Sequence, residues 1–156
     1  VAAAVSIDAS DIAMSQGIEG WSAGLPYLFV PLKDIDALGR ARIKMDAWEN
    51  SLKHSWASEP YLFVAHEGAV RARMFAPNLG VMEDPATGSA CASFAGYLAS
   101  RSAQHDGMLS VTVHQGVEMG RPSRLDLEVD LSEGKVQAVR VGGASVLVSS
   151  GTLHMP

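Results

Sequence analysis

Apolar residues recur at two different spacings in the first third of the chain, and each spacing predicts a different element. Met45, Trp48 and Leu52 follow the helical period, with polar residues between them, over about residues 44–54. This pattern predicts an amphipathic helix that lies with its apolar face on a sheet. The short apolar run at 27–30, which a Gly-Leu-Pro segment introduces, predicts a buried strand instead.

Most of the remaining chain has the pattern of strands joined by tight turns. Two apolar runs flank a Glu-Gly turn at 67–68, which predicts a hairpin of strands 61–65 and 70–75. Further strands are expected in the C-terminal third, at 109–114, 125–131, 135–141 and 145–148. Because these strands mostly follow one another directly, a mainly antiparallel sheet is favoured over a parallel array.

One segment of this strand-rich chain has the pattern of a helix without a polar face. Between Gly88 and about Ser100 there is no proline, and apolar or small residues fall on every side of a helix. Such a helix is expected to be buried on all sides. Together the patterns predict an α+β fold in which a mostly antiparallel sheet wraps around one central apolar helix.

Composition and charge limit the classes of function. With 156 residues, 47% of them hydrophobic and 19% charged, the chain is expected to form one globular domain spanning 1–156. Its formal net charge of −5 disfavours nucleic acid and anionic membranes as partners. No apolar run approaches the ~18–20 residues that a membrane-spanning helix needs. The single cysteine, Cys91, excludes an internal disulfide and suits the reducing cytoplasm.

The densest group of candidate site residues lies where the apolar helix is expected to begin, in the run Glu-Asp-Pro-Ala-Thr-Gly-Ser-Ala at 83–90. A helix start leaves backbone amides unpaired and carries a partial positive charge, so residues 88–90 offer their amides to a carboxylate or phosphate. Ser89 adds a hydroxyl, and Asp84 suits an amine on the same ligand. An alternative interpretation is that Asp84 or Thr87 simply caps the helix.

Other reactive side chains favour structural interpretations. Cys91 is better explained as an inert buried thiol than as a nucleophile, because it lies in the apolar helix. Arg71 and Arg73 share one face of a strand, and we expect solvated edge residues there rather than an anion site. The five histidines lack the spacing of metal ligands, so no metal is expected.

Three longer segments resemble one known family. They are Arg-Met-Phe-Ala-Pro at 73–77, the run at 80–90, and Gln-Gly-Val-Glu-Met-Gly-Arg-Pro-Ser at 115–123. In order and spacing they are similar to the phenazine-biosynthesis isomerase-like family, which belongs to the diaminopimelate epimerase superfamily. The segment at 24–32 resembles the start of that family's second domain, so the resemblance runs over essentially the whole chain.

The resemblance implies a two-domain enzyme of which this chain is the C-terminal half. In the family each domain is a sheet around a central helix, and the substrate lies between the two helix starts. The family's proton-shuttling glutamate and its cysteine-glycine-histidine element belong to the first half, and this chain lacks both motifs. The expected function is the substrate-orienting half of a cofactor-independent isomerase, which shuttles a proton on a small carboxylate-bearing metabolite without metal, flavin or nucleotide.

Residue by residue, the resemblance implies that Asp84 and Ser89 orient the substrate in catalysis. It implies that Thr87, Gly88 and Ser89 bind the substrate, with the amides of Gly88 and Ser89 receiving its carboxylate. Thr87 stands where the superfamily's cysteine-dependent epimerases have a thiol acid/base. A threonine hydroxyl is far too weak an acid to exchange a proton with a carbon acid, which disfavours two-base racemisation.

Some alternatives stay open at this point. Glu118 and Arg121, in the third motif, either reach the substrate cleft or form an ion pair that stabilises a turn, and no role is assigned to them. The chain is alternatively a stand-alone, non-catalytic binding or dimerisation module, or half of an amino-acid epimerase or dehydratase. Loss of a partner domain would expose an apolar surface, so a homodimer is expected.

Overall fold

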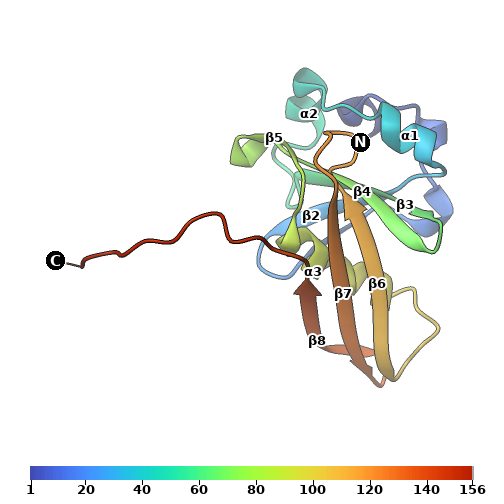
Figure 1. Ribbon diagram of the computed structural model, residues 1–156. Helices are drawn as coiled ribbons and strands as arrows, with labels where there is room; N and C mark the ends of the chain where they lie inside the picture. Colours follow the sequence, from blue (N-terminus) through green and yellow to red (C-terminus); the bar gives the residue numbers. More distant parts are fainter. Residues whose placement is uncertain (156) are drawn as a thin grey trace.

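The computed structural model describes residues 1–155, and its main feature is one curled sheet of eight strands around a single long helix (Figure 1). The strands are β1 (Glu19–Ser22), β2 (Pro26–Pro31), β3 (Glu59–His66), β4 (Ala69–Ala76), β5 (Val81–Asp84), β6 (Gly107–Gln115), β7 (Ser123–Ser132) and β8 (Lys135–Gly142). The helices are α1 (Ile35–Arg40), α2 (Met45–Ser51) and α3 (Gly88–Ala99), with short 3-10 turns at Ala2–Val5, Ala9–Asp11, Met14–Gln16 and Pro77–Leu79. The predicted α+β class is confirmed.

The sheet is mostly antiparallel, as the short connections predicted. Its strand order is β1-β2-β3-β4-β6-β7-β8, and β5 pairs with β4. Two pairs are parallel, β2 with β3 and β4 with β6, and helices lie in both connections. The chain leaves β4, forms β5 and then enters α3 before it returns as β6. The start of α3 therefore lies directly after β5.

Several elements predicted from the sequence are confirmed. The apolar run at 27–30 lies in β2. The amphipathic pattern at 44–54 contains the shorter helix α2, whose Trp48 and Leu52 cluster mainly with Ala4 of the first 3-10 turn and not with the sheet as predicted. The predicted hairpin is formed by β3 and β4. Its turn residues, Glu67 and Gly68, have φ values of 50° and 77°, the left-handed conformation that a two-residue hairpin turn of this kind requires.

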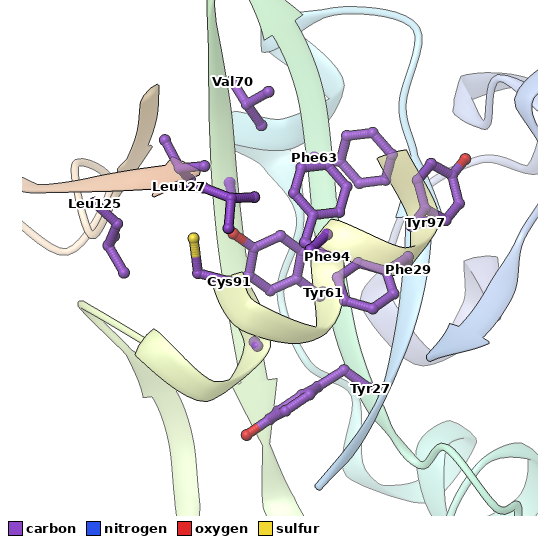
Figure 2. Close-up of a cluster of buried hydrophobic side chains, with 14 of the residues drawn as sticks. Tyr27, Phe29, Tyr61, Phe63, Val70, Cys91, Phe94, Tyr97, Leu125 and Leu127 are labelled. Atoms are coloured by element: carbon purple, nitrogen blue, oxygen red, sulfur yellow. The ribbon is translucent and has the colours of Figure 1, made fainter. Parts of the chain in front are cut away.

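Helix α3 is buried because its side chains meet the inner face of the curled sheet. The Phe94 ring lies against Phe29, Tyr61, Phe63 and Tyr97, with ring centroids 4.7 to 5.7 Å apart (Figure 2). This packing explains why the helix has no polar face. None of the helices in residues 1–155 combines the length and apolar composition needed to cross a bilayer.

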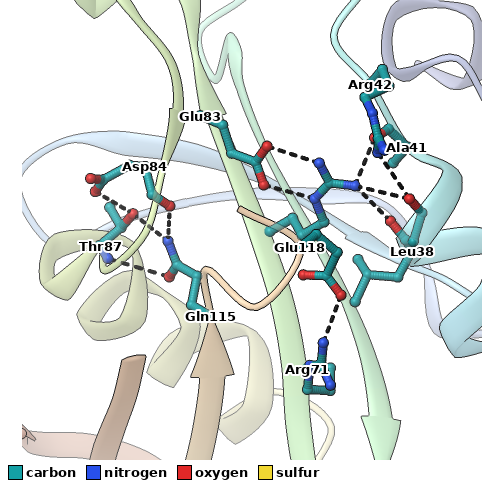
Figure 3. A network of polar contacts seen from close by, with 11 residues as sticks. Leu38, Ala41, Arg42, Arg71, Glu83, Asp84, Thr87, Gln115 and Glu118 are labelled. Carbon is teal, nitrogen blue, oxygen red and sulfur yellow. Dashed lines mark hydrogen bonds and ion pairs between the residues drawn. The ribbon is translucent and has the colours of Figure 1, made fainter. Parts of the chain in front are cut away.

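The other face of the sheet carries a buried arginine. Arg73 on β4 is 2% exposed. Its guanidinium donates to both carboxylate oxygens of Glu83, at 2.7 and 2.8 Å, and to the backbone oxygens of Leu38 and Ala41 (Figure 3). The prediction of solvated edge arginines is therefore wrong. Because β4 is an internal strand between β3 and β6, Arg71 and Arg73 are both largely covered.

The strand predicted at 145–148 is not formed, which is a second correction. β7 and β8 pair as far as Gly142 opposite Asp126, and β8 is the last strand in the order. The following residues therefore have no neighbouring strand in the described chain. The side chains from Val146 to Val148 are 85–92% exposed, and the C-terminal arm, residues 143–155, extends away from the sheet in Figure 1.

Candidate functional site

The candidate site lies where the chain passes from β5 into α3. β5 ends at Asp84, a short loop containing Pro85 follows, and α3 begins at Gly88. Gly88 and Ser89 are exposed, and their backbone amides donate no hydrogen bond within residues 1–155. Unpaired amides at a helix start, with the partial positive charge of the helix, favour an anionic group such as a carboxylate.

Asp84 is oriented by hydrogen bonds that lead back to a buried glutamine (Figure 3). Gln115, at the end of β6, donates from Nε2 to the Thr87 hydroxyl at 2.8 Å and to the backbone oxygen of Asp84 at 2.6 Å. The Thr87 hydroxyl in turn donates to Asp84 Oδ2 at 2.8 Å. The other carboxylate oxygen, Oδ1, makes no hydrogen bond in the described chain, so it is available to a ligand.

This network contradicts the interpretation of Asp84 or Thr87 as a simple helix cap. Thr87 occupies the position before α3, but its side chain makes no capping hydrogen bond. Its hydroxyl contacts Gln115 and Asp84 instead. Gln115 carries little signal in the sequence beyond its place at the end of an alternating strand pattern, because its partners lie about thirty residues away along the chain.

Ser89 lies on the wall of a cavity of about 230 Å³ beside the start of α3. Its hydroxyl oxygen is 2.6 Å from that of Tyr27 on β2. Asp84 and Thr87 line the same cavity, with apolar side chains from β4, from β5 and from the segments before β2 and β5. Gly88 lies on a larger, open hollow of about 730 Å³ between the start of α3 and the end of β8. The structure thus brings the predicted site residues together at one end of the helix.

The third sequence motif holds the loop before α3 in position. Gly116 has a φ of +75°, and a Cβ there would lie under 3.0 Å from backbone atoms of both Arg121 and Pro85. Glycine therefore permits a close approach of two loops that no other residue allows. Glu118 pairs with Arg71 on β4 at 2.6 Å, so the ion pair considered between Glu118 and Arg121 is not formed.

Cys91 and the histidines add no reactive centre to this site. Cys91 is buried in α3, and burial raises the pKa of its thiol to about 12, so the thiol stays protonated. The prediction of an inert buried thiol is confirmed. Within residues 1–155, no group of three or more His, Cys, Asp or Glu side chains is placed to hold a metal ion.

The sequence motifs predicted a sheet curled around one helix, and the structure has this fold. Asp84, whose side chain is oriented by Thr87, lies near the start of that helix. The chain belongs to the phenazine biosynthesis-like protein family, whose sequence pattern matches residues 3–151. Several of the relatives that this chain matches are named isomerases.

Two curated relatives illustrate the similarity. An uncharacterized isomerase from Mesorhizobium japonicum is 42% identical over 142 residues, covering 86% of this chain and 47% of that protein. The trans-2,3-dihydro-3-hydroxyanthranilate isomerase of Pseudomonas fluorescens is 36% identical over 136 residues, covering 87% of this chain and 47% of that protein. The chain therefore spans about half the length of the curated relatives it matches.

Solved structures show the same fold. One described as a predicted epimerase from Pseudomonas aeruginosa matches with a TM-score of 0.64 and 34% identity, covering 96% of this chain and 51% of that chain. A phenazine biosynthesis protein of the PhzF family from Bacillus anthracis matches with a TM-score of 0.75, over 83% of this chain and 45% of that chain. At 24% identity, this second likeness concerns the fold alone.

Proposed function

We propose that this chain is the substrate-orienting part of a cofactor-independent isomerase, which moves a proton within a small carboxylate-bearing metabolite. The observation that carries the proposal is the combination of an open helix start with an oriented carboxylate. Gly88 and Ser89 present unpaired amides, and Asp84 has one oxygen without a partner in residues 1–155. A molecule that carries both an anionic group and a hydrogen-bond donor is complementary to this pair.

The name of the Pseudomonas fluorescens relative supports the same substrate class. The compound in that name, a dihydro-hydroxyanthranilate, has a carboxylate together with an amine and a hydroxyl. In this proposal the amides of Gly88 and Ser89 bind the carboxylate, and Asp84 accepts a hydrogen bond from the amine. Thr87 lies in the same cavity and orients Asp84. Negative charge that builds up as a carbon loses its proton is stabilised by the helix start.

The proton itself is carried by a group outside this chain. The titratable side chains on the Ser89 cavity are Asp84 and Tyr27, and Asp84 is committed to substrate orientation. The hydroxyl of Thr87 is too weak an acid for carbon-acid chemistry, which disfavours two-base epimerisation. We therefore place the proton-carrying carboxylate in a second domain that faces the start of α3, consistent with relatives about twice as long as this chain.

Replacement of Asp84 by asparagine is expected to slow isomerisation by about 10²-fold or more, because misorientation of a substrate by ~1 Å has that effect. Ser89→Ala removes one hydrogen bond and is expected to slow it by about tenfold. The measurement uses the complete product of the reading frame that contains this chain. Conversion of trans-2,3-dihydro-3-hydroxyanthranilate is followed by NMR in D2O, where deuterium in the product reports proton transfer.

Asp36→Asn is the matched control, since it makes the same chemical change on the exposed face of α1. Its rate is expected to equal that of the unmodified protein. If the unmodified protein converts the substrate and the Asp84 and Ser89 variants do so equally fast, the proposed roles of these residues are wrong.

We also propose that the C-terminal arm is covered by a second copy of the chain. Val146, Leu147, Val148 and Leu153 on this arm are each at least 85% exposed, a concentration of apolar surface that favours association. A dimer brings these side chains out of water and supplies the neighbouring strand that the arm lacks within its own sheet. The expected oligomer is a symmetric pair, the commonest arrangement of identical chains.

The chain is expected to sediment as a dimer at high concentration, and a variant that ends at Gly142 as a monomer. The substitutions Val146→Ser and Val148→Ser are also expected to weaken the dimer, because they remove apolar area from the arm. Alanine at Ser149 and Ser150 leaves the apolar residues in place and serves as the control. A strictly monomeric profile of the unmodified chain would refute this proposal.

A further inference from the structure

Glu59, at the start of β3, is a buried glutamate on the same face of the sheet as the aromatic residues of that strand. Side chains alternate between faces along β3, so Glu59, Tyr61 and Phe63 all lie on the face that meets α3. Tyr61 and Phe63 contact the ring of Phe94, whereas Glu59 occupies the first position of the strand and is 5% exposed. Charged side chains are rarely buried to this degree without a partner.

One of the two carboxylate oxygens of Glu59 lacks a partner within residues 1–155. The Ser58 hydroxyl donates to Glu59 Oε1 at 3.0 Å, and Asn78 Nδ2 donates to the Ser58 hydroxyl at 2.9 Å. Glu59 Oε2 is buried and makes no hydrogen bond. In the same described chain Glu59 forms no ion pair. A buried acceptor without a partner is unfavourable, so the fold itself does not account for this group.

Stability does not explain the carboxylate either. Burial raises the pKa of Glu59, and the hydrogen bond from Ser58, together with the nearby side-chain and backbone amides of Asn78, opposes that shift. The folded chain therefore holds this proton more tightly than the unfolded chain, and stability is lost as the pH rises from the ordinary value of 4.5 through the raised pKa. A glutamine would fill the same volume without this loss.

Glu59 lines a cavity of about 170 Å³ that adjoins the candidate site. Leu25, Tyr27 and Leu79 line both this cavity and the one that contains Asp84 and Ser89. Tyr27 connects the two directly, since it is the register partner of Glu59 in the β2 and β3 ladder and its hydroxyl contacts Ser89. Leu25 and Leu79 are 48% and 54% exposed, so one ligand that lies on these two side chains borders both cavities.

We propose that the Glu59 cavity is a binding subsite for a hydrogen-bond-donating group, an ammonium or a hydroxyl, on the molecule whose carboxylate lies at the start of α3. The inference rests on the proposed function and adds a residue that selects substrates by the substituents they carry. Glu59 accepts the donor through Oε2, which a rotation of the side chain brings to the cavity, and the side chains of Leu25 and Leu79 contact the apolar part of the ligand.

The chemistry of the cavity favours this class of ligand over others. An anionic substituent is repelled by the carboxylate of Glu59, which carries the only formal charge among the side chains that line the cavity. A bare apolar substituent would leave the unpartnered oxygen buried and unsatisfied. An ammonium or hydroxyl satisfies it, and a hydrogen bond to a charged group is among the stronger polar contacts.

Benzylammonium tests the subsite separately, because it combines a ring with a donor and carries no carboxylate. Binding to the chain is followed through the amide signals of Ser58 and Asn78 in 1H–15N NMR spectra. We expect these signals to shift, and we expect binding by Glu59→Gln to be weaker by about tenfold or more. Benzyl alcohol is the second arm: the tighter of the two probes shows whether the subsite prefers an ammonium or a hydroxyl.

Glu49→Gln is the matched control, since Glu49 is exposed on α2 and pairs there with Lys53. It is expected to bind benzylammonium as the unmodified chain does. Equal affinity in Glu59→Gln, or no shift at Ser58 and Asn78, overturns the proposal. Glu59→Gln is expected to be at least as stable as the unmodified chain at neutral pH, so failure of this variant to fold would show a structural role and overturn it as well.

A benzoate titration separates this inference from the proposed function. Benzoate carries the anion without the donor, and it is expected to shift the signals of Gly88 and Ser89. If benzoate does not shift these signals but benzylammonium still binds, the anion site is contradicted and the Glu59 subsite is supported. Benzoate shifts without Glu59-dependent benzylammonium binding count against the subsite alone.

Discussion

Replacement of Arg73 by alanine is expected to destabilise the chain by about 3–5 kcal/mol, because it leaves a partly buried carboxylate without its partner. Glu83 receives two hydrogen bonds from this guanidinium, and the backbone oxygens of Leu38 and Ala41 receive two more. The arginine therefore joins β4 to β5 and to the end of α1. Since Glu83 directly precedes Asp84, the substitution is also expected to loosen the candidate site.

Urea unfolding followed by tryptophan fluorescence measures this loss of stability. Arg140→Ala is the control, because Arg140 pairs with Glu128 and Asp130 on the exposed surface of the sheet. Exposed ion pairs are screened by solvent, so a far smaller change is expected there. An Arg73→Ala variant as stable as Arg140→Ala would mean that the buried network contributes little to this fold.

Phe94→Ala is expected to destabilise the chain by about 3–5 kcal/mol, the usual range for a large aromatic side chain removed from a packed core. Phe94 contacts the rings of Phe29, Tyr61, Phe63 and Tyr97. No single neighbour is able to fill the space that the substitution opens, because each is held by its own strand or by α3. The sheet would then lose its main contact with the helix that carries Ser89.

Chemical unfolding followed by far-UV circular dichroism compares this variant with Leu98→Ala. Leu98 also lies on α3 but is only partly buried against the same cluster, so its loss is expected to be clearly smaller. The reverse order of the two losses would contradict the description of Phe94 as the centre of the core.

Local patterns predicted the elements whose form depends on neighbouring residues in the chain. The hairpin of β3 and β4 follows from two apolar runs and a Glu-Gly turn, and α3 follows from twelve residues without a proline or a polar face. The strand expected at 145–148 did not form, because an apolar, β-branched sequence becomes a strand only where another strand lies beside it. The sequence pattern contains no information on whether that neighbour is present.

The candidate site likewise contains residues that the sequence predicted and residues that only the structure identified. Asp84, Thr87, Gly88 and Ser89 are close in the chain, so one motif was enough to predict them. Their supporting residues come from distant strands: Gln115 from β6 and Tyr27 from β2.

Glu59 is the clearest example of a residue whose environment the sequence pattern did not predict. In the sequence it is one of 17 acidic residues, between a serine and a proline. Only the packing of β3 against α3 and the loop around Asn78 makes it a buried group with an unsatisfied oxygen. Burial and pairing are properties of three-dimensional neighbours, which sequence spacing does not report.

The sequence by itself therefore determined the fold class, the apolar central helix and the residues at its start, because periodicity and short motifs act over a few residues. The tertiary structure decided which charges are buried, as for Arg73 and Glu59. It also decided how Asp84 is oriented and which strands find partners. These outcomes depend on contacts between residues far apart in the chain, and their energies arise only when the sheet closes around α3.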